Sequence, residues 1–185
     1  YGNLNLWTTT DPNVGVITKS GGRFIHNFGI DSIYMGLAAG NFAASGSGNN
    51  TGIGTSSLAN LQNGAYNTGV GSFALALNTT GSNNTAGGTY ALRSNTAGSR
   101  NAAHGYATLY ANTLGNDNTA IGYGALWNNT TAHNNTAVGS GALYTQSFTD
   151  ANPAYVTNNT AVGFQALYSN QPGPLNSVNG KNNTG

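Results

Sequence analysis

Cysteine is absent from this chain of 185 residues, which excludes a disulfide framework and a thiolate metal site. Charge is scarce too: Asp, Glu, Lys and Arg make up 5% of the residues, and the net charge is +1. A chain with this balance has no basic surface for nucleic acid or for an anionic membrane. No apolar run approaches the roughly 18 residues that span a bilayer. We therefore expect no nucleic-acid partner and no membrane insertion.

Glutamate is also missing, which bears on catalysis. The carboxylates have no spacing typical of an acid–base pair and the histidines do not cluster: Asp11, Asp31, Asp117, Asp150, His26, His104 and His133. General acid–base chemistry needs such groups within reach of one reacting atom. The sequence leaves open a Ser-His-Asp arrangement made by folding, but no motif indicates one. We predict a protein that is not an enzyme and has neither catalytic residues nor a cofactor.

What the chain does contain is a repeat, Asn-Thr-Ala/Gly-Val/Ile-Gly, two variable residues, Ala-Leu and a polar tail. Its first Asn recurs in five steps of 17 residues from Asn50 to Asn135 and then in two steps of 24 to Asn159 and Asn183. A fixed period of this size is typical of a structural unit stacked on copies of itself. With ten Tyr and six Phe, the chain also differs from disordered sequences, which are poor in aromatics.

Three positions of the repeat do not vary among the complete copies, if the first Asn is counted as position 1. Position 1 is Asn, position 5 is Gly and position 9 is Leu: Asn50, Asn67, Asn84, Asn101, Asn118, Asn135 and Asn159; Gly54, Gly71, Gly88, Gly105, Gly122, Gly139 and Gly163; Leu58, Leu75, Leu92, Leu109, Leu126, Leu143 and Leu167. Position 4 is mostly Val or Ile, and position 8 is small. An unvaried Gly predicts a positive φ or a close backbone approach, and the Asn residues predict a ladder of stacked amides.

The repeat therefore predicts an all-β fold, a parallel β-roll or β-solenoid. Each coil is expected to hold a strand, a Gly turn, a short second strand with Ala-Leu, and a polar loop. Its core would contain one Val or Ile, one Leu and some Ala. A buried Leu contributes only about 1.5–3 kcal/mol, against an ordering entropy of about 1–2 kcal/mol per residue. We therefore expect several rods to associate along their length.

Two segments frame the regular coils, which run over 50–134. Residues 1–30 do not follow the period and are predicted to form an N-terminal β cap, on their own chain or on a neighbour, before the repeats of 31–185. The coils of 135–182 are expanded by seven residues each, and we expect these insertions to project from one face. Because residues 182–185 begin another copy, we expect the chain to be a fragment of a longer protein.

The string Asn-Asn-Thr-Ala-Val-Gly-x-x-Ala-Leu, at 134–143 and 158–167, resembles the repeats of bacterial and phage-type tail-fibre and surface-adhesin proteins. It is more distantly similar to the Ser-Val-Ala-Ile-Gly repeats in the heads of trimeric autotransporter adhesins. Residues 2–29 also resemble the segment that precedes such repeats in tail fibres. The resemblance implies a homotrimeric, β-prism-like fibre that is extracellular, on a cell surface or a virion, and that attaches to other surfaces.

Aromatic residues recur at position 10 and are the candidate ligand contacts: Tyr110, Trp127, Tyr144 and Tyr168. Exposed rings at regular spacing stack on sugar rings, so this column is our candidate for a glycan contact. The alternative is that the rings cover the flank of the Leu ladder or a seam between chains.

His104 replaces the Val or Ile of position 4, and this makes it the candidate metal position. If that column faces a three-fold axis, three His104 side chains meet there and could hold an anion, a water molecule or a metal ion. Otherwise the histidine simply faces solvent or is hydrogen-bonded in place, and the chain binds no metal.

We therefore predict a non-enzymatic fibre or adhesin segment that extends from a surface and mediates attachment, with glycans as one candidate ligand. Its partners would be further copies of itself and a host or environmental surface. A first alternative is a shaft or filament subunit that binds no ligand and stacks end to end. A second is an ice-binding solenoid, because Thr recurs at position 2.

Overall fold

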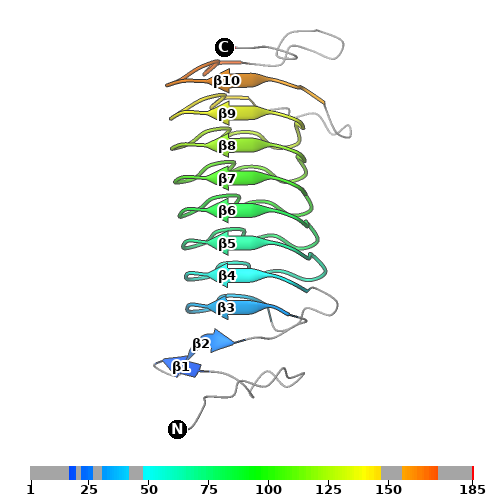
Figure 1. Ribbon diagram of the computed structural model, residues 1–185, viewed down its shortest axis with the longest axis vertical. Helices are drawn as coiled ribbons and strands as arrows, with labels where there is room; N and C mark the ends of the chain where they lie inside the picture. The colour runs from blue at the N-terminus through cyan, green and yellow to red at the C-terminus, as the bar shows by residue number, and fades with distance from the viewer. Residues whose placement is uncertain (1–16, 20–21, 27–30, 42–47, 147–155, 171–184) are drawn as a thin grey trace.

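The computed structural model describes residues 17–19, 22–26, 31–41, 48–146, 156–170 and 185. Within these residues all regular structure is β: β1 (Ile17–Lys19), β2 (Gly22–His26), β3 (Ile33–Met35), β4 (Thr51–Ile53), β5 (Thr68–Val70), β6 (Thr85–Gly87), β7 (Ala102–His104), β8 (Thr119–Ile121), β9 (Thr136–Val138) and β10 (Thr160–Val162). The strands form a single sheet in sequence order. Figure 1 shows them stacked into a rod, with one strand in each coil from β3 onward. The predicted β-solenoid is confirmed.

The coils are parallel and in register. Thr51 pairs with Thr68, and the same position pairs at every step up to β10. The 24-residue step keeps this register, because Thr160 pairs with Thr136 as Thr136 pairs with Thr119. The insertions therefore leave the strand stack unchanged. Most of their residues, 147–155 and 171–184, lie outside the described part, so the predicted direction of the insertions stays a prediction.

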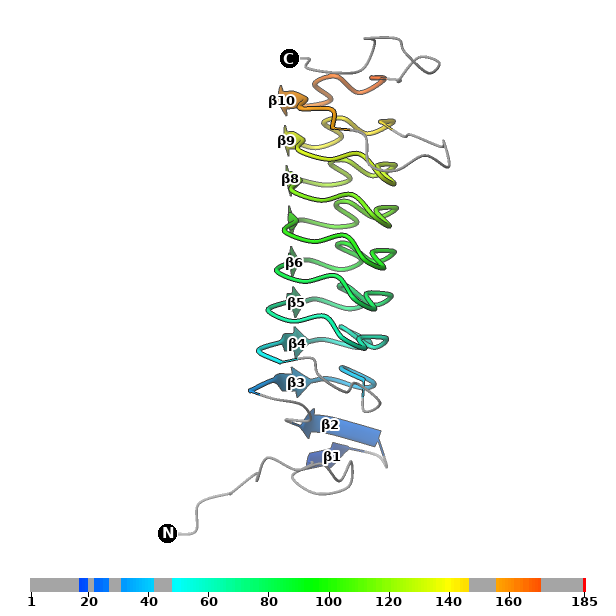
Figure 2. The ribbon, with the colours of Figure 1, turned by 90° about the vertical axis from the view of Figure 1, so that its right-hand side faces the viewer.

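The N-terminal end of the stack differs from the rest. β1 and β2 form an antiparallel pair, and β2 pairs antiparallel with β3, through Ile25 with Met35 and His26 with Tyr34. Figure 2 shows this pair beneath the first coil. These eight residues are the described part of the cap predicted for 1–30. The remaining residues of that segment lie outside the described part.

The unvarying glycine of position 5 allows neighbouring coils to approach closely. Gly88 has a φ of +140°, and a Cβ added there would lie 2.4 Å from the carbonyl oxygen of Gly105. Both facts exclude any other residue, since φ near this value is disfavoured for L side chains and the new carbon would overlap backbone. The same geometry recurs along the stack at Gly54, Gly71, Gly105, Gly122 and Gly139.

The interior of the rod contains amides as well as Leu and Ala. The side-chain nitrogen of each Asn from Asn67 to Asn135 donates to the side-chain oxygen of the Asn one coil earlier, at 3.0–3.2 Å. A second ladder at position 12 joins Asn78, Asn95, Asn112 and Asn129. These side chains are fully or almost fully buried. Buried amides are tolerated because nearly all of their donors and acceptors are paired; the exception is the side-chain oxygen of Asn129, at the end of the second ladder.

Two details of the predicted coil are wrong. Position 4 is not in the core of the chain: its Val and Ile side chains are between 38% and 61% exposed at Ile53, Val70, Ile121 and Val162. The reason is the alternation of a strand. Asn at position 1 and the small residue at position 3 face the interior. Thr at position 2 and the residue at position 4 therefore face outward.

The second error is the strand predicted for Ala-Leu. Positions 6–9 form turns, and the Leu residues have positive φ, for example +50° at Leu92 and +52° at Leu109. A left-handed residue interrupts an extended strand. The Leu side chains from Leu58 to Leu143 are nevertheless completely buried, because the turn directs them into the rod.

Candidate binding surfaces

The first candidate surface is the outer face of the stacked strands, which we call the strand face. It consists of two columns, Thr at position 2 and mostly Val or Ile at position 4, from β4 to β10. Ala102 interrupts the Thr column, and Gly87 and His104 interrupt the other. No Asp, Glu, Lys or Arg stands in either column. The strand face is thus a mostly β-branched strip without carboxylate, Lys or Arg side chains, and its side chains are exposed or half-buried in the single chain.

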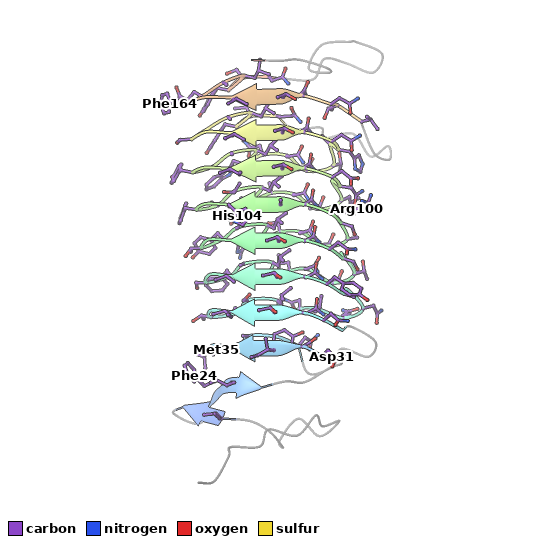
Figure 3. The ribbon with its side chains drawn as sticks, viewed as in Figure 1. Phe24, Asp31, Met35, Arg100, His104 and Phe164 are labelled. Carbon is purple, nitrogen blue, oxygen red and sulfur yellow. The ribbon has the colours of Figure 1, made fainter. Side chains whose placement is uncertain are left out.

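His104 lies on this strand face, and its side chain is exposed. Figure 3 places it on β7 in the middle of the stack. Its ring covers Gly87 of the preceding coil, where an added Cβ would lie 2.7 Å from Nδ1. Among the described residues of the chain no three His, Cys, Asp or Glu side chains gather to hold a metal. A site at His104 would need copies of His104 from other chains, so the metal or anion site stays a prediction.

The second candidate surface is a row of stacked aromatic rings along one corner, which we call the aromatic spine. The four predicted contacts lie together in it: ring centroids are 5.0 Å apart for Tyr110 and Trp127, 5.7 Å for Trp127 and Tyr144, and 5.0 Å for Tyr144 and Tyr168. Interplanar angles of 5–27° make these stacked pairs. Because each ring covers the face of the next, the spine presents ring edges to solvent. Its use as a glycan contact stays a prediction.

The spine extends into coils where position 10 is not aromatic. Phe73 and Tyr90, at position 7, stack at 5.4 Å, and Tyr90 meets Tyr110 edge to face at 6.3 Å. Where position 7 is aromatic, position 10 is Ala76 or Arg93. From Tyr110 to Tyr144 position 10 is aromatic, and position 7 is Ala or Gly. The aromatic residue thus stands at position 7 in the earlier coils and at position 10 in the later ones. This pattern appears only when the two positions are compared with each other.

A third group of rings stands at position 6, beside the spine, and we call it the outer column. Tyr106 and Tyr123 stack at 5.4 Å with an interplanar angle of 9°. Ser140 and then Phe164 follow at the same position in the next two coils. Both Tyr rings are exposed, and Phe164 is more exposed than either. This column was not among the predicted contacts.

The described carboxylates do not form a catalytic pair. Asp117 is bonded to Arg100 through two hydrogen bonds of 2.6 and 2.8 Å, and this contact holds the pKa of the Asp117 carboxyl below its usual value. Asp31 belongs to the first coil, five coil steps from Asp117. Asp11 and Asp150 lie outside the described residues. Asp117 is therefore an ionised partner of Arg100 on an exposed edge.

His133 ends a third ladder of hydrogen bonds, at position 16. The backbone N–H groups of Ala65, Ser82 and Ser99 donate to the side chains of Ser82, Ser99 and Asn116, and that of Asn116 donates to Nδ1 of His133 at 2.8 Å. Burial lowers the pKa of His133, against a smaller opposing effect of Asp117. The imidazole is therefore held neutral as an acceptor, a structural role.

Within the described ranges the chain has no helix that is long and apolar enough to cross a bilayer. Comparisons with protein-family models, with curated proteins and with solved structures found no match for this chain.

Proposed function

We propose that this chain is a segment of a non-enzymatic extracellular fibre that extends from a cell or virion surface and mediates attachment. In this proposal three copies lie side by side as a homotrimer, and their strand faces form the seam. The observation that carries the proposal is the exposed column of Ile53, Val70, Ile121 and Val162, together with the partly exposed Val138, along one side of the rod.

A seam on the strand face is favoured by its composition and shape. Each Ile or Val that passes from exposed to buried contributes up to about 1.5–3 kcal/mol, so a column of five stabilises an assembly substantially. No charged side chain of the two columns has to lose its hydration. Exposed contiguous apolar patches of this kind typically mark interaction sites.

The rod shape supports a role as a spacer. The strands β3 to β10 span seven coil steps, and at about 4.8 Å per step they extend for about 34 Å. Length along a fibre then grows with each added repeat, while every coil contacts only its neighbours. Attachment would use the surfaces that the seam leaves exposed, the aromatic spine and the outer column.

The proposal is tested by the mass of the purified 185-residue chain in solution, measured by light scattering. A homotrimer gives about three times the 18.8 kDa of the single chain. A mass of 18.8 kDa at all concentrations contradicts the fibre seam. Assemblies that keep growing with concentration favour the filament alternative.

A second candidate function is ice binding, because the structure exposes two parallel columns of β-branched residues on one neutral sheet. Their coil spacing is regular, and regularly spaced Thr hydroxyls can order water. This function needs a free strand face and thus a monomer. Thermal hysteresis that disappears in Thr119→Tyr, in a chain of monomeric mass, would favour it over the fibre.

A further inference from the structure

The outer column contains one interruption. Its residues from the fourth complete coil onward are Tyr106, Tyr123, Ser140 and Phe164, so an aromatic ring is missing at one level between two aromatic rings. Tyr123 is 58% exposed and Phe164 is 77% exposed. Figure 3 shows the labelled side chain of Phe164 projecting from the edge of the last coil. We call the space over Ser140, between Tyr123 and Phe164, the Ser140 interval.

The height of the Ser140 interval follows from the strand register. Ile121, Val138 and Val162 are paired partners, so the residues two places later, Tyr123, Ser140 and Phe164, stand one coil step apart. Two steps of about 4.8 Å separate the level of Tyr123 from that of Phe164, about 9.6 Å in all. Stacked rings one step apart in this chain have centroids 5.0–5.7 Å apart. The interval therefore has the height of one additional ring.

Polar groups border the interval on its inner side. Ser140 carries a hydroxyl at its base. The adjacent Gly141 has no side chain, and a Cβ there would lie 3.3 Å from Cγ of Gln165 and 3.4 Å from the ring of Tyr168. Burial and then the phenols of Tyr168 and Tyr123 raise the pKa of Tyr144. The Tyr144 hydroxyl therefore remains protonated.

The surroundings indicate a neutral ligand rich in hydroxyls. Residues 118–146 and 156–170, the described coils around the interval, contain no Asp, Glu, Lys or Arg. A flat aromatic ligand needs only about 7 Å between two rings, since carbon atoms meet at about 3.5 Å on each side. The height of about 9.6 Å admits a thicker, puckered ring as well as an aromatic one. The negative face of an aromatic ring attracts the polarised C–H groups that a sugar ring carries.

We propose that Tyr123 and Phe164 bind the two faces of one pyranose unit of a neutral glycan, with Ser140 beneath it. The ligand takes the level at which the column lacks an aromatic side chain. This assignment rests on the proposed attachment function and names its ligand class. It also places the contact in the outer column, beside the aromatic spine, where the side chains of Tyr123 and Phe164 are exposed.

The test measures binding of neutral oligosaccharides of glucose, galactose and N-acetylglucosamine to the 185-residue chain by saturation-transfer NMR and titration. Ser140→Tyr adds a ring at the missing level and should abolish binding. Phe164→Ala removes one wall and should weaken binding about tenfold, a typical loss for one stacking partner. Ser72→Tyr is the matched control, since it makes the same change at position 6 between Thr55 and Thr89, and it should bind as the wild type does.

Circular dichroism must show that each variant keeps the fold. If Ser140→Tyr does not fold, Phe164→Ala still tests the proposal, because it changes an exposed side chain. The proposal is overturned if the wild type binds none of these oligosaccharides, if it binds indole in their place, or if the folded Ser140→Tyr chain binds them equally well. If the chain is a trimer and its glycan binding is unchanged in Ser140→Tyr, only the proposed site at the Ser140 interval is contradicted. If the chain is a monomer and Ser140→Tyr abolishes its glycan binding, only the proposed trimeric fibre is contradicted.

Discussion

Replacing Asn101 by Ala is expected to destabilise the rod strongly. Asn101 is 1% exposed and accepts hydrogen bonds from the backbone N–H and the side-chain amide of Asn118, at 3.0 and 3.1 Å. The substitution leaves both donors buried without their acceptor. Gly115 keeps another donor for its carbonyl oxygen, the side chain of Asn112 at 3.1 Å, so the loss falls mainly on the Asn118 donors.

The expected magnitude follows from these two groups. A buried donor that loses its partner costs about 1–3 kcal/mol, so the free energy of unfolding should fall by about 2–6 kcal/mol for two such donors. Denaturant unfolding followed by circular dichroism measures this loss. Hydrogen exchange at the Asn118 amide gives a local measurement that does not depend on two-state unfolding of a repeat array.

Asn63→Ala serves as the control, because Asn63 is exposed and its substitution should change stability by less than about 0.5 kcal/mol. The reasoning is refuted if Asn101→Ala and Asn63→Ala lose similar stability, or if exchange at the Asn118 amide is unchanged.

Three further substitutions test other contacts. Gly88→Ala should prevent folding, as seen by circular dichroism, because its Cβ would lie 2.4 Å from the Gly105 oxygen. Gly124→Ala should lower the free energy of unfolding by about 1–2 kcal/mol, because its φ is +61° and the new Cβ would lie 3.2 Å from Cε2 of Tyr144. The chain should still fold, since Ala107 has a φ of +51° at the same position of its coil. The pKa of His133 is lowered in the folded chain, so the unfolded chain binds the proton more readily. The stability that the neutral histidine contributes is therefore present above about pH 6.5 and is lost as the pH falls. His133→Asn should reduce this loss of stability on acidification. Equal pH dependence of the unfolding midpoints in both chains would contradict this last expectation.

The stack of coils could be predicted from the regular repeat in the sequence. Identical residues at a fixed spacing must occupy equivalent places, so Gly88 and Gly105 had to share one backbone geometry. A polar Asn in such a column predicts an amide ladder, since only a partner in the next coil can satisfy it inside a rod. These inferences need no knowledge of which way each side chain points.

Directions within the coil could not be predicted in the same way. A strand of three residues contains a single alternation. Hydrophobicity alone placed Val138 inside, although strand alternation does not allow both Val138 and the Asn135 of the amide ladder to face inward. In the structure the Asn side chains are buried and the Val column lies outside, because each amide is paired with the amide of the next coil. The left-handed conformation of Leu92 has no sequence signal, since Leu rarely adopts it.

The candidate surfaces were predictable only in part. The position 10 column was visible, and Tyr110 and Trp127 do lie together. The ring-on-ring stacking that covers their faces depends on coil spacing and on side-chain orientation, which the sequence does not give. The Ser140 interval needed the register across the 24-residue step, because Phe164 is 24 residues from Ser140 and 41 from Tyr123.

Cross-linking through single cysteines tests most directly whether the strand face is the seam of a trimer. The chain has no cysteine, so any disulfide must come from an introduced residue. Three-fold symmetry places the same residue of all three chains at the same height along the fibre. Ile121→Cys should therefore give disulfide-linked pairs of chains in a non-reducing gel after mild oxidation. Leu114→Cys, exposed at position 14 of the polar tail, should remain monomeric in the gel. Rapid cross-linking of Leu114→Cys with none for Ile121→Cys would contradict the account.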